Sequence, residues 1–238
     1  MSISVAMASC NGERYIAEQI ASILPQLGEA DELIVSVNPS RDQTEEIVRA
    51  FSRKDPRVKV FLCPSPGVLP NFENAIRQCR GEIIFLSDQD DIWTPEKVGR
   101  QLACFQDPSI GGVCHACTLI DSGGNVISAP TGQGRRRQIS VPEILVKNPV
   151  QGCCLAFRRE LREVFLPFPQ DIPMHDSWIG ACISRESRLL YLDESLLLYR
   201  QHAGTVTTRK HGSLRKMAAD RLHLLRNLLQ RDREGHAR

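Results

Sequence analysis

The fold of this chain is decided by the stretch Ile83-Ile84-Phe85-Leu86-Ser87-Asp88-Gln89-Asp90-Asp91-Ile92-Trp93. Its first five residues predict a buried β-strand. Three carboxylates follow within residues 88–91, and we call these four residues the acidic turn. Thr94-Pro95-Glu96 is then typical of a helix start, because proline is favoured in a first helical turn. Carboxylates this close repel one another unless a hard cation coordinates them. The stretch therefore indicates a metal-binding turn after a core strand, although Asp also favours ordinary solvated turns.

The residues before this stretch repeat the order of strand, loop and helix. Apolar runs at residues 3–8, 33–37 and 58–62 predict three more strands, and a segment with helical spacing follows each run. Four successive units of this kind predict an α/β domain with a mainly parallel central sheet and helices on both faces. Ligands of such sheets bind beyond the carboxyl ends of the strands, so Asn11 and Asn38 should lie close to the acidic turn.

The second half of the chain is less regular. Apolar runs at residues 111–121, 151–157, 189–192 and 196–199 predict further strands. Residues 122–138 are rich in Gly, Ser, Pro and Arg, and we interpret them as a mobile loop that is either a lid or a solvated connection.

The last part of the chain predicts a basic amphipathic helix. From Ser213 onward, leucines recur at helical spacing among Arg and Lys residues. Such a helix could lie on an anionic membrane surface, pack on the domain, or join two copies in a homodimer.

Composition places the chain among ordinary globular proteins. Its 238 residues are 42% hydrophobic and 24% charged, which suits one domain with a sizeable core. A net charge of +2 argues against nucleic acid as a partner. No apolar run reaches the ~18 residues of a membrane span and no signal-peptide pattern is present, so we expect a cytoplasmic protein. The nine cysteines indicate reduced thiols, with a zinc site formed by Cys114, His115 and Cys117 together with Cys153-Cys154 as the alternative.

Three motifs of the chain resemble the family 2 glycosyltransferases of the GT-A fold, in the form of bacterial rhamnosyltransferase-like members. The acidic turn with Ile92-Trp93 looks like the DxD region of that family, which holds a divalent metal on the diphosphate of a nucleotide-sugar. His175-Asp176-Ser177-Trp178 resembles the segment that supplies the catalytic base, and Tyr199-Arg200-Gln201-His202 the strand end that completes the metal and diphosphate site. The resemblance extends over residues 3–205.

The resemblance implies an inverting hexosyl- or deoxyhexosyltransferase. The enzyme would use Mg²⁺ or Mn²⁺, a nucleotide-sugar donor, and a saccharide or lipid-linked saccharide acceptor of bacterial surface polysaccharide or glycolipid synthesis. Asp176 would be the general base, and Asp90 and His202 the metal ligands. The implied substrate contacts are Ala8, Cys10, Asn11, Asn38, Asn71, Asp88, Asp91 and Arg200 for the donor, and Trp93, Gly152 and His175 for the acceptor.

The same resemblance divides the chain into three parts. Residues 1–108 would form the nucleotide-sugar-binding half and residues 109–208 the acceptor-binding half of one GT-A domain, with the basic helix in residues 209–238.

The sequence departs from the family pattern beside the expected nucleobase. Val37-Asn38-Pro39 stands where the family usually has Asp-Asp-Gly, and Cys10 stands in place of an aromatic residue. Asn38 can still present an acceptor and a donor to a pyrimidine edge.

Other interpretations remain open at this point. Asp176 could simply cap its helix, and His202 could be an ordinary surface histidine. The whole chain could be a non-catalytic nucleotide-sugar-binding protein, or a nucleotidyltransferase, although residues 9–14 lack the Gly-rich loop of that class.

Overall fold

A computed structural model describes residues 1–129, 136–202 and 214–235, and within them one sheet holds nine strands. The first part of the chain contributes β1 (Ile3–Ser9), β2 (Glu32–Val37), β3 (Val58–Leu62) and β4 (Ile83–Ser87). The second part contributes β5 (Ile92–Trp93), β6 (Ile110–Ile120), β7 (Arg136–Ile139), β8 (Ala156–Arg158) and β9 (Arg188–Arg200).

The strands follow the order β3-β2-β1-β4-β8-β6-β9-β5, and β7 pairs with β9 beside this path. β1 pairs in parallel with β2 and β4, and β2 with β3, which confirms the predicted parallel arrangement of the four β-α units. β8 runs antiparallel between β4 and β6, whereas β6 and β9 are parallel. The predicted mainly parallel sheet is therefore confirmed, with antiparallel strands added in the second half.

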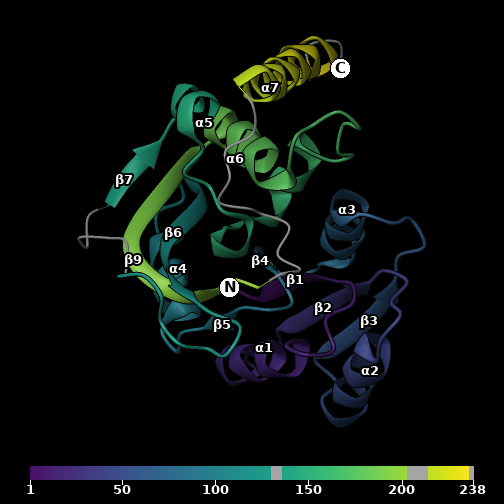
Figure 1. The fold of residues 1–238 in the computed structure, drawn as a ribbon. Helices are drawn as coiled ribbons and strands as arrows, with labels where there is room; N and C mark the ends of the chain where they lie inside the picture. Colours follow the sequence, from purple (N-terminus) through teal and green to yellow (C-terminus); the bar gives the residue numbers. More distant parts are fainter. Residues whose placement is uncertain (130–135, 203–213, 236–238) are drawn as a thin grey trace.

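Helices cover both faces of the sheet (Figure 1). In this view α3 (Val68–Gln78) lies on one side of β1, β2 and β3, and α1 (Ile16–Ile23) and α2 (Thr44–Lys54) lie on the other. Every residue of β2 is buried, which is why Leu33, Ile34 and Val35 at its centre are all apolar instead of alternating with polar residues. The remaining helices are α4 (Lys97–Cys104), α5 (Val141–Lys147), α6 (His175–Glu186) and α7 (Leu214–Gly235).

Three predicted elements differ in detail from the structure. The strand predicted at residues 151–157 is mostly absent. The segment forms a 3₁₀ turn, Gly152–Cys154, which is followed by the short strand β8. Residues 189–199 form one strand, β9, whose pairing with β6 contains register shifts. Ile92 and Trp93 form β5 by pairing with β9, so the following helix begins only at Lys97.

Residues 122–138 are not one continuous loop. Ile120 and Val126 form an antiparallel bridge, and β7 begins at Arg136. Residues 130–135, on which the predicted lid depends, lie outside the described residues. Arg137 stacks on Tyr191 with its guanidinium 4.7 Å from the ring centre, and it forms an ion pair of 2.6 Å with Glu143. The charge of this arginine is therefore used within the fold.

The C-terminal helix α7 packs against α5 and α6 at the outside of the molecule (Figure 1). Leu224 and Leu228 are buried in this contact, and Arg185 of α6 donates to the carbonyl oxygen of Leu228 over 2.9 Å. Packing on the domain, one of the alternatives for this segment, is therefore observed. Among the described residues, none of the helices has the length and apolar character needed to cross a bilayer.

All nine cysteines are free thiols, as predicted. Cys114 is buried in β6, and in the described part of the chain neither it nor Cys117 belongs to a group of three side chains that could hold a metal. The cysteines of β6 therefore act as small core residues.

Candidate active site

A cavity of about 330 Å³ lies beyond the carboxyl ends of β1, β2 and β4. Its walls also include the beginnings of α3 and α6 and the 3₁₀ turn before β8. This is where a parallel sheet is expected to bind ligands, because the strand ends and helix N-termini meet there. The cavity is lined by nine of the predicted site residues: Ala8, Cys10, Asn38, Asn71, Asp88, Asp90, Gly152, His175 and Asp176.

The two predicted metal ligands are in direct contact. His202 Nε2 lies 2.7 Å from Asp90 Oδ2, and the two side chains are 17% and 16% exposed. Asp90 belongs to the acidic turn after β4, whereas His202 follows the end of β9. The interpretation of His202 as an ordinary surface histidine is therefore not supported.

Arg200 and Asp91 hold the acidic turn against the end of β9. The backbone N–H of Arg200 donates to Asp91 Oδ1 over 3.0 Å, and its Nε donates to the carbonyl oxygen of Asp90 over 2.8 Å. The guanidinium also forms an ion pair of 2.6 Å with Glu18. Arg200 and Asp91 are almost fully buried, and neither lines the cavity. Their observed contacts position the acidic turn, and donor contact by these two residues stays a prediction.

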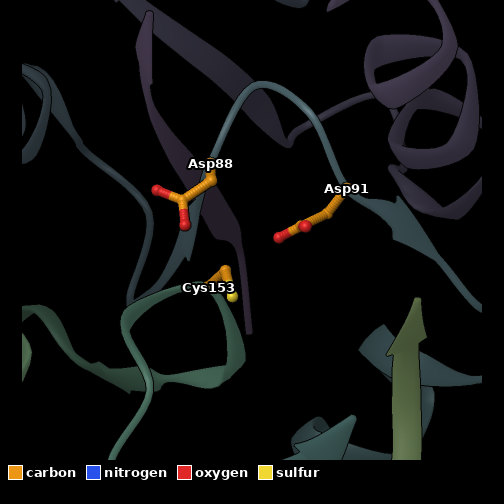
Figure 2. Close-up of side chains that lie close together, drawn as sticks. All are labelled: Asp88, Asp91 and Cys153. Atoms are coloured by element: carbon orange, nitrogen blue, oxygen red, sulfur yellow. The ribbon is translucent and has the colours of Figure 1, made fainter. Parts of the chain in front are cut away.

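Asp88, Asp91 and Cys153 come together beneath the acidic turn (Figure 2). One ligand atom from each lies within 4.8 Å of the others, and Asp91 Oδ2 is buried without a hydrogen-bond partner. Burial raises the pKa of Asp88 to about 7, with the carboxylates of Asp90 and Asp176 adding to the rise. Burial also raises the pKa of Asp91, again with neighbouring carboxylates contributing.

A divalent cation would suit this group of acids. It would supply the positive charge that the crowded carboxylates lack. The residues present therefore fit the metal that the family resemblance implies. Asp90 and His202 lie beside this group and are not members of it.

Asp176 lines the cavity from the first turn of α6. The N-cap of this helix is Met174, so Asp176 does not occupy the capping position that was its alternative role. One oxygen of its carboxylate accepts the N–H of Ser177. Burial raises the pKa of Asp176 to about 6, and the backbone N–H of Ser177 opposes part of that rise. A carboxylate with such a pKa is ionised at neutral pH and is a stronger base than an exposed one.

Asn38 offers less to a nucleobase than the sequence suggested. Its Nδ2 donates to the carbonyl oxygens of Cys63 and Ser65, over 2.9 and 2.8 Å. Both amide hydrogens are thereby used, so only the acceptor Oδ1 remains for a ligand. The prediction that Asn38 presents a donor as well is therefore wrong.

Cys10 and Gln89 join the loop after β1 to the acidic turn. Gln89 Oε1 accepts the backbone N–H of Cys10 over 2.9 Å, and Gln89 Nε2 donates to the Cys10 carbonyl over 2.8 Å. A Cβ on Gly12 would lie 2.1 Å from Gln89 Oε1, so this close approach requires glycine. Sequence reasoning missed Gln89 as a functional residue, although it stands between two of the acids that were singled out.

Two more of the predicted contact residues do not line the cavity, in addition to Asp91 and Arg200. Asn11 has a φ of 49° and accepts the N–H of Arg41 over 2.8 Å, so it links the loops after β1 and β2. Trp93 is 3% exposed because β5 holds it in the core, where its ring lies 5.8 Å from that of Phe85. The structure therefore gives Trp93 a packing role in place of the expected acceptor contact.

Other residues of the site lie outside the set of site residues that the sequence predicted. Cys153 looked like a strand residue, and Phe72, Gln151, Met174 and Tyr199 line the cavity without belonging to the predicted set.

Comparison with known proteins finds curated relatives of similar sequence and solved structures of similar fold. The chain is 26% identical to the dTDP-rhamnosyl transferase RfbG of Shigella flexneri, over 82% of this chain and 71% of that protein. Four other curated relatives at 26% identity are longer, and this chain spans 65% of their length.

Two solved structures share the fold. Residues 1–349 of Staphylococcus aureus TarS, in complex with UDP-GlcNAc, superpose with a TM-score of 0.72 at 19% identity, over 97% of this chain and 72% of that one. The mannosyltransferase PcManGT of Pyrobaculum calidifontis, in complex with GDP-Man and Mn²⁺, gives a TM-score of 0.62 at 20% identity, over 92% of this chain and 61% of that one. These likenesses confirm the predicted GT-A fold.

The model of the family described as "Glycosyl transferase family 2" matches residues 4–165. This segment contains β1 to β4, the acidic turn and the 3₁₀ turn that closes the cavity. The chain belongs to glycosyl transferase family 2.

Proposed function

We propose that this chain transfers a sugar from a nucleoside-diphosphate donor to a hydroxyl of an acceptor, with inversion at the anomeric carbon. The observation that carries the proposal is the arrangement of acids around one cavity. Asp88 and Asp90 line it from the acidic turn, and Asp176 lines it from α6. Family membership supports the reaction class, and it agrees with the UDP-GlcNAc bound to TarS and the GDP-Man and Mn²⁺ bound to PcManGT.

The donor would occupy the N-terminal part of the cavity. Ala8, Cys10 and Asn38 stand at the ends of β1 and β2, and Asn38 Oδ1 would accept an N–H of the base. Asp90 and His202 would hold Mg²⁺ or Mn²⁺ next to the diphosphate, with Asp88 and Asp91 close by. When bound, such an ion neutralises charge that develops on a diphosphate leaving group. The protein's own part is to fix this set of ligands, through Arg200 and the end of β9.

Asp176 would act on the acceptor. Its carboxylate would take the proton of the acceptor hydroxyl as that oxygen attacks the anomeric carbon, and the bond from that carbon to the diphosphate breaks. Residues 1–108 and 109–208 would thus supply the donor and acceptor sides of one domain. Gly152 would border the acceptor, which we propose to be a saccharide or a lipid-linked saccharide.

One assay tests the reaction class against its rivals. Purified protein with Mn²⁺ is given a panel of nucleotide-sugars, first alone and then with candidate acceptors, and free nucleoside diphosphate is measured. A glycosyltransferase releases the diphosphate faster when its acceptor is added. A non-catalytic binding protein releases none, and a nucleotidyltransferase forms a nucleotide-sugar from a nucleoside triphosphate and a sugar phosphate.

The exposed side chains of the C-terminal helix α7 are suited to contact with an anionic lipid surface. Leu222, Leu225 and Leu229 are 65%, 40% and 54% exposed, on a face of α7 that neighbours the buried face of Leu224 and Leu228. The helix therefore carries two apolar stripes, of which only one packs on the domain.

The positive charge on this face of α7 favours binding to a membrane over binding to a second copy of this chain. Arg215 and Arg226 fall on the same helical face as the exposed leucines and are themselves exposed. Two copies meeting through this face would bring like charges together, whereas anionic headgroups would neutralise them. We therefore propose peripheral membrane contact through α7.

A further inference from the structure

Tyr15 stands at the beginning of α1, next to the strand end that carries the proposed metal ligand His202. Its backbone is fixed there, because its N–H donates to the carbonyl oxygen of Gly12 and its own carbonyl oxygen accepts the N–H of Gln19, over 3.0 and 3.1 Å. The side chain is 7% exposed and does not line the cavity. Tyr15 is therefore a fixed, buried side chain outside the cavity.

The ring of Tyr15 contacts two residues of that strand end. The guanidinium carbon of Arg200 lies 4.7 Å from the ring centre, and the centre of the His202 ring lies 4.9 Å from it, with the two ring planes at 41°. The N–H of Gln201, between these residues, donates to the carbonyl oxygen of Ile120 in β6 over 2.8 Å, so the backbone is still paired there. Residues two apart in extended backbone point to the same side. Tyr15 therefore supports both side chains on one side of the strand end.

The contacts of Tyr15 with Arg200 and His202 are made by its ring and not by its hydroxyl group. In the part of the chain that the structure describes, the hydroxyl oxygen is buried and has no hydrogen-bond partner. The face of an aromatic ring attracts a guanidinium, and tilted aromatic pairs are also favourable. A phenylalanine ring can make the same contacts, whereas an aliphatic side chain cannot.

Arg200 and His202 are also in contact with the acidic turn. His202 Nε2 lies 2.7 Å from Asp90 Oδ2, and Arg200 is bonded to the side chain of Asp91 and to the backbone of Asp90. The imidazole of His202 follows the last residue of β9 and is 17% exposed, so it has room to turn unless a neighbour holds it. Residues that hold a ligand in its orientation affect metal affinity without touching the ion.

From these contacts we propose that Tyr15 is a positioning residue for the divalent-metal site. Its ring holds His202 and Arg200 against the acidic turn, so that His202 stays oriented toward Asp90. This inference rests on the proposed function, because it takes Asp90 and His202 as the metal ligands. Tyr15 itself touches neither the ion nor the substrates.

The test measures what the metal contributes to binding, without turnover. Calorimetry with UDP, GDP and dTDP, first with Mn²⁺ and then with EDTA, gives two dissociation constants for each nucleotide, and their ratio is the contribution of the metal. Tyr15→Leu removes the aromatic ring, so we expect the ratio to fall about tenfold while the constant in EDTA is unchanged. Tyr15→Phe keeps the ring and should keep the ratio of the wild type.

Two further variants separate positioning from a general loss of stability. Tyr191→Leu is the matched control, because the guanidinium of Arg137 lies 4.7 Å from the centre of that ring and Tyr191 does not line the cavity. It loses the same kind of contact and should keep the ratio of the wild type. Tyr15→Met offers a second side chain without a ring, and thermal unfolding shows which variants fold. If neither Tyr15→Leu nor Tyr15→Met folds, the ring serves the fold and the inference is overturned.

The remaining outcomes distinguish this inference from the proposed function. An unchanged ratio in folded Tyr15→Leu would overturn the inference alone, as would an equal loss in Tyr15→Phe or in Tyr191→Leu. A wild-type protein that binds nucleoside diphosphates equally well in Mn²⁺ and in EDTA would instead remove the metal from the proposed function, and the inference with it.

Discussion

His202 Nε2 lies 2.7 Å from Asp90 Oδ2, although the two residues are 112 positions apart in the chain. The contact forms because β9 returns across the sheet and ends beside the acidic turn, where Arg200 is bonded to both Asp90 and Asp91. The proposed metal site is therefore completed by tertiary structure.

Asp90→Asn should weaken the metal-dependent part of donor binding. The substitution keeps the shape of the side chain but removes the charge beside His202, which we expect to cost about 2 kcal/mol, or about thirtyfold in affinity. Calorimetry with a nucleoside diphosphate, with Mn²⁺ and then with EDTA, measures the effect. Asp107→Asn is the matched control, because Asp107 is an exposed aspartate that pairs with Arg188. Equal Mn²⁺ dependence in both variants would remove Asp90 from the metal role.

Asp176→Asn should abolish transfer and leave donor binding intact. An amide cannot take the proton of the acceptor hydroxyl, so we expect kcat to fall by about 10²–10⁴-fold. Turnover near that of the wild type would exclude Asp176 as the base. The pH profile gives a second measure. Because burial raises the pKa of Asp176 to about 6, the carboxylate is protonated and inactive below that pH. The value of kcat/KM should therefore rise as pH passes through about 6 and then level off.

Gln89→Ala should separate the loop after β1 from the acidic turn. Gln89 is bonded to both the N–H and the carbonyl oxygen of Cys10, and the variant loses both contacts. We expect nucleoside diphosphate to bind about fivefold more weakly, with a loss of about 1 kcal/mol in the free energy of unfolding. Binding and chemical denaturation together measure these changes. Unaltered affinity would show that the loop holds its position without this bridge.

Glu32→Gln should destabilise the fold at neutral pH. Burial alone would raise the pKa of Glu32, but the hydrogen bonds from Lys59 and Ser4 outweigh it and lower the pKa. A lowered pKa means that this stabilisation is present above the unfolded value of about 4.5 and is lost as pH falls through the folded value. We expect a loss of about 1.5–3 kcal/mol at pH 7 that shrinks toward acidic pH. Urea denaturation from pH 3 to pH 8 measures it, and a loss independent of pH would contradict the assignment.

Replacing Leu225 and Leu229 by Ser should release the protein from anionic vesicles. The exposed stripe of α7 would lose much of its apolar surface, while the stripe of Leu224 and Leu228 stays packed on the domain. Flotation with phosphatidylglycerol vesicles and with neutral phosphatidylcholine vesicles measures the change. Leu62→Ser is the control, because Leu62 is 56% exposed on β3. If the double variant instead turned a dimer into a monomer in light scattering, the stripe would be a self-association surface.

The local pattern of the chain was sufficient to predict the parallel half of the fold. The buried run at residues 83–87 and the three units before it became β4, β1, β2 and β3 with their helices, since burial on both faces of a sheet requires continuous apolar strands. The same reasoning placed Asn38 and Asp90 around one cavity, because parallel strands end at the same edge.

Only the tertiary structure decided which side chains reach the cavity. Trp93 and Asp91 adjoin the same acidic motif as Asp90, yet pairing of β5 with β9 turns Trp93 into the core, and the N–H of Arg200 holds Asp91 beneath the turn. Cys153 and Phe72 were not predicted as site residues, since a buried cysteine or phenylalanine looks the same in sequence whether or not a cavity lies beside it. Sequence periodicity determined burial and the direction of strands, whereas contacts between distant segments determined what each side chain of the site can touch.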